Sequence, residues 1–137
     1  VGAASALKMS YAAVTKGLTA LAIQSLASAK AYGVDKELDA EMVASLRMLR
    51  ERFDRSLPGM APKAYRWVGE MEEIARTFND VGLDPQIFMG AAETFRLVAG
   101  TALGQETPER RTIGFTADEV SEIIAGALEA GLPQSGD

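Results

Sequence analysis

Apolar residues recur every three or four positions along most of this chain, which is the spacing of amphipathic α-helices. The first stripe lies in a segment of small residues and predicts a helix from about Ala3 to Tyr32 that stops at Gly33. Its members are Leu7, Tyr11, Val14, Leu18, Leu21 and Leu26. Such a helix spans roughly 45 Å, so we expect it to join two domains or two subunits.

The next two helices are expected to pack against this first one. Asp35 can cap the second helix, which turns four large apolar side chains toward the core. These are Leu38, Met42, Leu46 and Leu49. A charged stretch then ends at Pro58-Gly59, which is a loop signal, and a third helix is expected from about Pro62. Its apolar stripe contains Ala64, Trp67, Val68, Met71, Ile74, Ala75 and Phe78.

The last two helices have clear boundary signals. Gly82 ends the third helix, Asp84 caps the fourth, and Pro85 takes its first position. The fourth stripe contains Ile87, Phe88, Ala91, Phe95 and Val98. After a polar loop over residues 104–115, Thr116 and Glu119 form a capping box for a last helix. That helix carries Val120, Ile123, Ile124 and Leu128.

No segment alternates with a period of two over a useful length, so the fold class predicted is all-α. We expect one domain over residues 1–137, a bundle of about five to seven helices around one long central helix. From Leu18 to Ala29 the first helix is apolar nearly all round, which predicts that this part of it is buried.

Composition narrows the range of functions. The chain has 137 residues, a formal net charge of −5 and neither cysteine nor histidine. The negative charge argues against nucleic acid and against an anionic membrane as partners. The missing residue types exclude a Cys/His metal site and a Ser–His or Cys–His nucleophile pair. We expect no metal, no membrane span and a cytoplasmic location. The chain begins at Val1, so we expect it to be a piece of a longer protein.

Lys8 is the first candidate for chemistry, because it stands in apolar surroundings near the positive end of the first helix dipole. Its stem can lie along the surface while its ammonium reaches water, or a desolvated site can use it for proton transfer. Position alone leaves both interpretations open. Glu70 to Glu73 are best interpreted as a solvated helix face, and Trp67 as a core residue.

The opening segment GAASALKMSYAAVTKG resembles the start of the C-terminal helical domain in the 6-phosphogluconate dehydrogenase and β-hydroxyacid dehydrogenase superfamily. Gly2 stands six residues before Lys8, as the first motif glycine of that family does, and Ala4 replaces a second glycine. The segment KAYRWVGEMEEIARTFNDVGLDPQIFMGAAETFRLVA is similar to one branch, phosphogluconate-dehydrogenase-like NAD-binding proteins whose C-terminal domain is poorly understood.

The resemblance implies an all-helical substrate and dimerisation domain of an NAD- or NADP-dependent oxidoreductase. The cofactor is then held mainly by a Rossmann domain upstream of Val1, and the present chain alone is expected to bind it weakly. The family's lysine, here Lys8, is the catalytic general base. The implied substrate is a small molecule, a hydroxy acid or a related carbonyl or imine compound.

Four further positions match substrate positions of the family but carry other residue types. Tyr11 replaces a histidine, Ala12 an asparagine and Thr15 a glutamate that acts in decarboxylation. Glu72 stands where many relatives have a lysine that reaches the active site. These departures argue against oxidative decarboxylation of 6-phosphogluconate.

The sequence therefore supports two hypotheses, which assign functions of different classes. The first is the oxidoreductase domain with Lys8 as its proton-transfer group. The second is a stand-alone helical module that makes only protein contacts, in which Lys8 is a surface residue. In either case the long apolar helix predicts a homodimer through the helical domain, with the second half of that helix at its centre.

Overall fold

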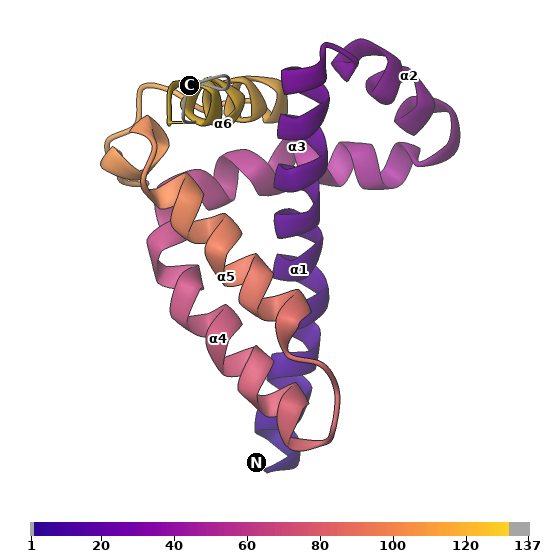
Figure 1. Cartoon of the computed structure of the whole chain (residues 1–137), viewed down its shortest axis with the longest axis vertical. Helices are drawn as coiled ribbons and strands as arrows, with labels where there is room; N and C mark the ends of the chain where they lie inside the picture. Colours follow the sequence, from indigo (N-terminus) through magenta and orange to yellow (C-terminus); the bar gives the residue numbers. More distant parts are fainter. Residues whose placement is uncertain (1, 132–137) are drawn as a thin grey trace, which may run out of the picture.

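The computed structural model describes residues 2–131, and all regular elements in this range are helices (Figure 1). They are α1 (Ala3–Tyr32), α2 (Asp35–Ser45), α3 (Arg47–Met60), the 3₁₀ helix η1 (Ala61–Lys63), α4 (Ala64–Asp80), α5 (Gln86–Ala99), η2 (Ala102–Gln105) and α6 (Ala117–Gly131). The predicted all-α class is confirmed. None of the helices within residues 2–131 is both long enough and apolar enough to cross a bilayer.

Helix α1 runs the length of the molecule and has the predicted ends (Figure 1). It contains 30 residues and stops at Gly33, whose φ of 72° lies in the left-handed region. There the Gly33 N–H donates to the carbonyl of Lys30, and the Val34 N–H donates to that of Ala29. A side chain at position 33 would disfavour this conformation, so the glycine ends the helix where the apolar stripe ends.

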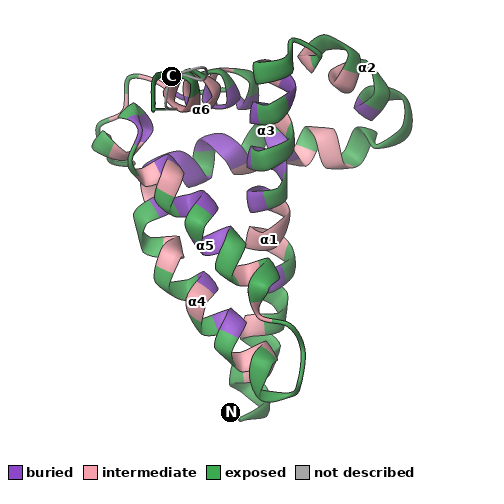
Figure 2. Ribbon diagram, viewed as in Figure 1, coloured by how far each residue is buried: buried purple, intermediate pink, exposed green. Residues whose placement is uncertain are grey.

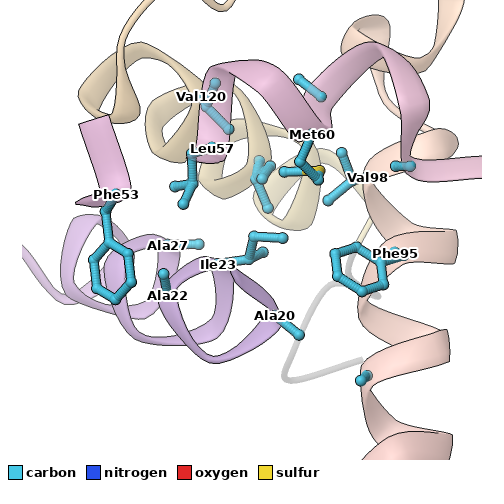
Figure 3. Close-up of a cluster of buried hydrophobic side chains, with 14 of the residues drawn as sticks. Ala20, Ala22, Ile23, Ala27, Phe53, Leu57, Met60, Phe95, Val98 and Val120 are labelled. Atoms are coloured by element: carbon cyan, nitrogen blue, oxygen red, sulfur yellow. The ribbon is translucent and has the colours of Figure 1, made fainter. Parts of the chain in front are cut away.

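The core forms where the second half of α1 meets α3, α5 and α6 (Figure 3). Ala22 and Ile23 of α1 are 1% exposed, and Leu57 of α3 is fully buried. Leu21, on the opposite side of α1, is 60% exposed. The prediction that residues 18–29 are buried all round is therefore wrong on one side, because the other helices cover only part of the circumference of α1 (Figure 2).

Asp35 does not cap α2. Val34 is the cap residue, and the Asp35 carboxylate instead accepts a hydrogen bond from Lys30 Nζ at 3.0 Å. Lys30 Nζ also lies 2.6 Å from the Asp118 carboxylate of α6. Hydrogen bonds to Asp118 and then Asp35 raise the pKa of Lys30, and the bond from Lys30 lowers the pKa of Asp35. The lysine thus joins the end of α1 to both α2 and α6.

The segment predicted as one second helix is broken in two. Leu46 has φ −135° and ψ 40°, which no α-helix accommodates, so α2 ends there and α3 begins at Arg47. Met42 points into the core as predicted, whereas Leu46 is 50% exposed. The break turns the chain so that α2 and α3 form a projecting hairpin (Figure 1).

The loop predicted at Pro58-Gly59 is absent, because both residues lie in the last turn of α3. Leu57 and Met60 are fully buried on either side of them, and their burial holds the helical path despite the hydrogen bond that a proline removes. Pro62 then lies in η1, directly before α4 begins at Ala64.

The predicted turn between α4 and α5 is confirmed. Gly82 has a φ of 94°, and the Asp84 carboxylate accepts a hydrogen bond from the Gln86 N–H at 2.8 Å. Both predicted positions are off by one residue: Pro85 is the cap residue rather than the first helical position, and Asp84 lies one residue before the cap. This turn folds α5 back along α4 (Figure 1).

The capping box before α6 is half formed. Thr116 Oγ1 accepts a hydrogen bond from the Glu119 N–H at 3.0 Å, as predicted. The Glu119 carboxylate reaches further back and accepts from the N–H groups of Gly114 and Phe115, at 2.8 and 3.3 Å. It therefore ties the preceding loop to the helix rather than closing the box on Thr116.

Glu106 makes the preceding loop pH-sensitive. Its Oε1 accepts from the backbone N–H groups of Thr112 and Ile113, each at 2.8 Å, and these bonds, led by that of Thr112, lower the pKa of Glu106 below its ordinary 4.5. Because the pKa of Glu106 is lower in the folded state, the hydrogen bonds to its carboxylate stabilise the fold fully above pH 4.5. This stabilisation is lost as the pH falls through the pKa of the folded state. The amide proton shifts of Thr112 and Ile113 should therefore titrate below pH 4.5 in an NMR series.

In Glu106→Gln this titration should vanish, and both amides should exchange faster at neutral pH. Glu109→Gln is the matched control, because Glu109 is an exposed glutamate of the same loop. An unchanged titration in Glu106→Gln would show that another group controls these amides.

Candidate functional site

The first half of α1 lies against α4, which runs antiparallel to it (Figure 1). Thr77 Oγ1 lies 2.8 Å from the sulfur of Met9. Further along α1, and earlier in α4, Lys16 pairs with Glu70. Residues 9–16 of α1 thus run beside residues 70–77 of α4. This contact determines which sides of both helices stay open for chemistry.

Four of the five predicted site residues share one open face of α1. Lys8, Tyr11, Ala12 and Thr15 follow the i, i+3, i+4, i+7 spacing of a helix face. Lys8 and Tyr11 are exposed, and Ala12 and Thr15 are half-buried. Thr15 Oγ1 donates a hydrogen bond to the Tyr11 carbonyl at 3.3 Å, so its proton is directed to the backbone. We call the face formed by these four residues the Lys8 face.

Lys8 carries a charge that no neighbour offsets within the described range. Its side chain forms no ion pair or hydrogen bond with any residue of 2–131, and the first turn of α1 contains no acidic residue. Lys16, two turns further on, is by contrast paired with Glu70, and its Nζ lies 4.7 Å from the centroid of the Trp67 ring. Lys8 is thus the cation of this half of α1 that is available to another molecule.

Glu72 lies away from the Lys8 face. Glu70 and Thr77 contact α1, and at about 100° per residue Glu72 points roughly 200° around α4 from Glu70. Glu73 points only about 60° from Glu70 and lies on the flank of α4 that borders α1. The structure therefore brings together Lys8, Tyr11, Ala12 and Thr15, but not Glu72. If the contact between Glu70 and α1 had been known, helical spacing would have identified Glu73, rather than Glu72, as a glutamate that borders α1.

Trp67 belongs to the core, as its spacing predicted. It packs edge-on against Phe95 of α5, with ring centroids 5.2 Å apart and planes at 85°. Lys16 covers the face of the Trp67 ring. The indole therefore links α1, α4 and α5 and holds the first half of α1 in place beneath the Lys8 face.

An apolar groove of about 490 Å³ lies between α1 and α5. Its lining residues on α1 are Ala13, Val14, Gly17, Leu18, Ala20, Leu21 and Gln24. On α5 they are Ile87, Phe88, Gly90, Ala91 and Thr94. The Gln24 amide donates to Thr94 Oγ1 at 2.9 Å across it. Gly17 points about 180° around α1 from Lys8, so this α1–α5 groove and the Lys8 face are separate surfaces.

Exposed apolar side chains occur in both halves of α1. Leu7, Tyr11 and Val14 of the first half are exposed, and so is Leu21 of the second half, whereas its neighbours Ala22 and Ile23 are buried in the core of their own chain. Helices α3, α5 and α6 thus cover one side of the second half of α1, and the expectation that this half forms the centre of a dimer stays a prediction. The apolar stripe from Leu7 to Leu21 and the α1–α5 groove beside it stay open to a partner.

Residues 29–98 match a protein family described as a domain of unknown function, DUF1932. The chain belongs to this family. The DUF1932 match begins in the last turn of α1 and ends within α5, so it includes the core helices and Glu72 but not Lys8. No curated protein and no solved structure matches the chain. Within residues 2–131 no three carboxylates are placed to hold a metal ion.

Proposed function

We propose that this chain is the substrate-binding and dimerisation domain of an NAD- or NADP-dependent oxidoreductase in which Lys8 transfers the proton. The observation that carries the proposal is the Lys8 face: an unpaired lysine in the second turn of a 30-residue helix, with Tyr11, Ala12 and Thr15 beside it. The resemblance of GAASALKMSYAAVTKG to the lysine motif of the dehydrogenase superfamily adds to this support. The DUF1932 family assigns no activity.

The nicotinamide ring, when bound, accepts or supplies the hydride. Ala12, one turn after Lys8, has a side chain small enough to leave room for a ring and a substrate over this face. A neutral Lys8 amine can take the proton of a substrate hydroxyl, and in the reductive direction the ammonium returns it. Both directions need a surface outside residues 2–131 to exclude water, because Lys8 is exposed.

The residue types beside Lys8 determine which charges this face offers a substrate. Beside Lys8 stand a phenol, a methyl group and a hydroxyl that is bonded to the backbone, so the Lys8 face itself holds no second charge. We infer that this face supplies proton transfer rather than a second cation for a carboxylate. That the substrate is a hydroxy acid or a related carbonyl or imine compound is what the resemblance to the dehydrogenase superfamily implies.

The test is the reading frame that encodes the chain. We expect a βαβ unit with a glycine-rich turn to be encoded ahead of Val1, because residues 1–137 contain no dinucleotide-binding loop. An initiator methionine directly before Val1 would contradict the oxidoreductase proposal. It would favour the second candidate, a helical module that makes only protein contacts, for which the exposed apolar stripe of α1 is the supporting observation.

A further inference from the structure

The exposed apolar stripe of α1 has the spacing of a helix–helix seam. Leu7, Tyr11, Val14, Leu18 and Leu21 are separated by four, three, four and three residues, the heptad pattern by which two helices interlock. Four of the five are exposed in this chain: Leu7 is 73%, Tyr11 71%, Val14 61% and Leu21 60% exposed. A second helix with a matching stripe would therefore cover it.

The stripe is symmetric about Val14. Leu7 and Leu21 each lie seven residues from it, and Tyr11 and Leu18 lie three and four residues from it on either side. A stripe with this symmetry is complementary to itself when a second copy runs in the opposite direction. The two copies are then related by a two-fold axis at Val14, which gives an isologous contact.

A ridge and a hollow occur side by side on this surface. The large side chains of Leu7 and Tyr11 form the ridge, and the lining of the α1–α5 groove begins at Ala13, two residues after Tyr11. The groove has small residues at Gly17, Ala20 and Gly90, which leave room for a side chain. A Cβ atom at Gly17 would lie 3.4 Å from Phe88, so α1 and α5 meet closely beneath it. An antiparallel copy would place its ridge over this hollow.

We propose that a second copy of this chain occupies the stripe and the groove, with the two α1 helices antiparallel and Val14 on the two-fold axis. Leu7 then lies against Leu21 of the partner subunit, and Tyr11 enters the partner's groove beside Leu18 of the partner subunit. This register rests on the dimer in the proposed function. It adds which surface the dimer uses, the relative direction of the two α1 helices and the residues that pair. Tyr11 borders both surfaces, and the other three residues of the Lys8 face, Lys8, Ala12 and Thr15, stay open to substrate in this dimer.

The exposed stripe supplies about half of the area that a standard interface needs from each partner. The exposed side chains of Leu7, Tyr11, Val14, Leu21 and Ile87 would bury on the order of 400 Å² per copy. That is about half of the roughly 800 Å² that each partner contributes to a standard interface. The walls of the groove supply further area, and no member of the stripe is charged.

Cysteine cross-linking tests the register, because the chain contains no cysteine of its own. Under mild oxidation Val14→Cys should form a disulfide-linked dimer by itself. Leu7→Cys and Leu21→Cys should each stay uncross-linked alone and should cross-link when the two variants are mixed. Glu122→Cys, on an exposed position of α6, is the control and should not cross-link.

The outcomes distinguish an error in the register from an error in the proposed function. Cross-linking of Leu7→Cys alone would show parallel helices and overturn the register while leaving a dimer. A monomer in analytical ultracentrifugation at tens of micromolar, with no cross-link at Val14→Cys, would overturn the dimer as well. Neither result bears on proton transfer by Lys8, which is measured by turnover.

A charge on the axis gives a second test. Val14→Glu places two carboxylates against each other in the dimer, and juxtaposed like charges should weaken the dimer at least about 100-fold in its dissociation constant. The helix content in circular dichroism should not change, because Val14 is exposed in the single chain. Met48→Glu is the matched control: Met48 is 86% exposed on the projecting α2–α3 hairpin and should leave the dissociation constant unchanged. Equal effects of both variants would overturn the proposed surface.

Discussion

Lys8→Met in the full-length protein should lower turnover by about 10²–10⁴-fold, the usual contribution of a general acid–base group. Methionine keeps most of the apolar stem and removes the nitrogen that carries the proton. The free energy of unfolding should hold or rise slightly, because Lys8 is exposed, makes no ion pair within residues 2–131, and stands near the positive end of α1. Steady-state kinetics and urea unfolding measure the two effects separately.

Lys8→Arg decides between the two interpretations of this residue. It keeps the charge, but a guanidinium does not release its proton at working pH. If Lys8 transfers a proton, the arginine variant should be nearly as inactive as the methionine variant. Full activity in Lys8→Arg would leave Lys8 a surface residue. Lys36→Met, at an exposed lysine on α2, is the control for the loss of a surface charge.

Phe95→Ala should lower the free energy of unfolding by about 3–5 kcal/mol, the range for removing a buried phenylalanine side chain. Phe95 is fully buried, its ring packs edge-on against Trp67 of α4, and it lies beside Ile23 and Met60 in the core (Figure 3). The cavity would open where α1, α3, α4 and α5 meet, so all four helices would lose packing contacts.

Phe115→Ala is the matched control for this prediction. Phe115 is 56% exposed, and its contact within the described range is with the guanidinium of Arg111, 5.0 Å from the ring centroid. Its loss should cost no more than about 1 kcal/mol. Urea unfolding of both variants should be measured at one protein concentration, because association raises apparent stability. Similar losses in the two variants would mean that Phe95 is not a central core residue.

Some features of the candidate site follow from helix geometry alone. Once α1 is recognised as a helix, the spacing of Lys8, Ala12 and Thr15 places them on one face wherever the helix packs. The relation of Glu72 to that face could not be obtained in this way. It depends on the rotation of α4 about its axis, which the contacts of Glu70 and Thr77 with α1 determine. The contribution of a second helix to a site is a tertiary property.

The sequence by itself determined the all-α class, both ends of α1 and the turn into α5. Each depends on a local signal that acts within a few residues: the apolar stripe, the left-handed conformation at Gly33, and the Asp84 carboxylate near the first N–H of α5.

Tertiary packing overruled some local signals, and only the tertiary structure decided which ones. The α3 helix continues through Pro58 because burial of Leu57 and Met60 outweighs the lost hydrogen bond. The open side of α1 was likewise decided by packing. Periodicity shows that a helix has an apolar stripe, but only the positions of α3, α5 and α6 determine which part of it stays exposed.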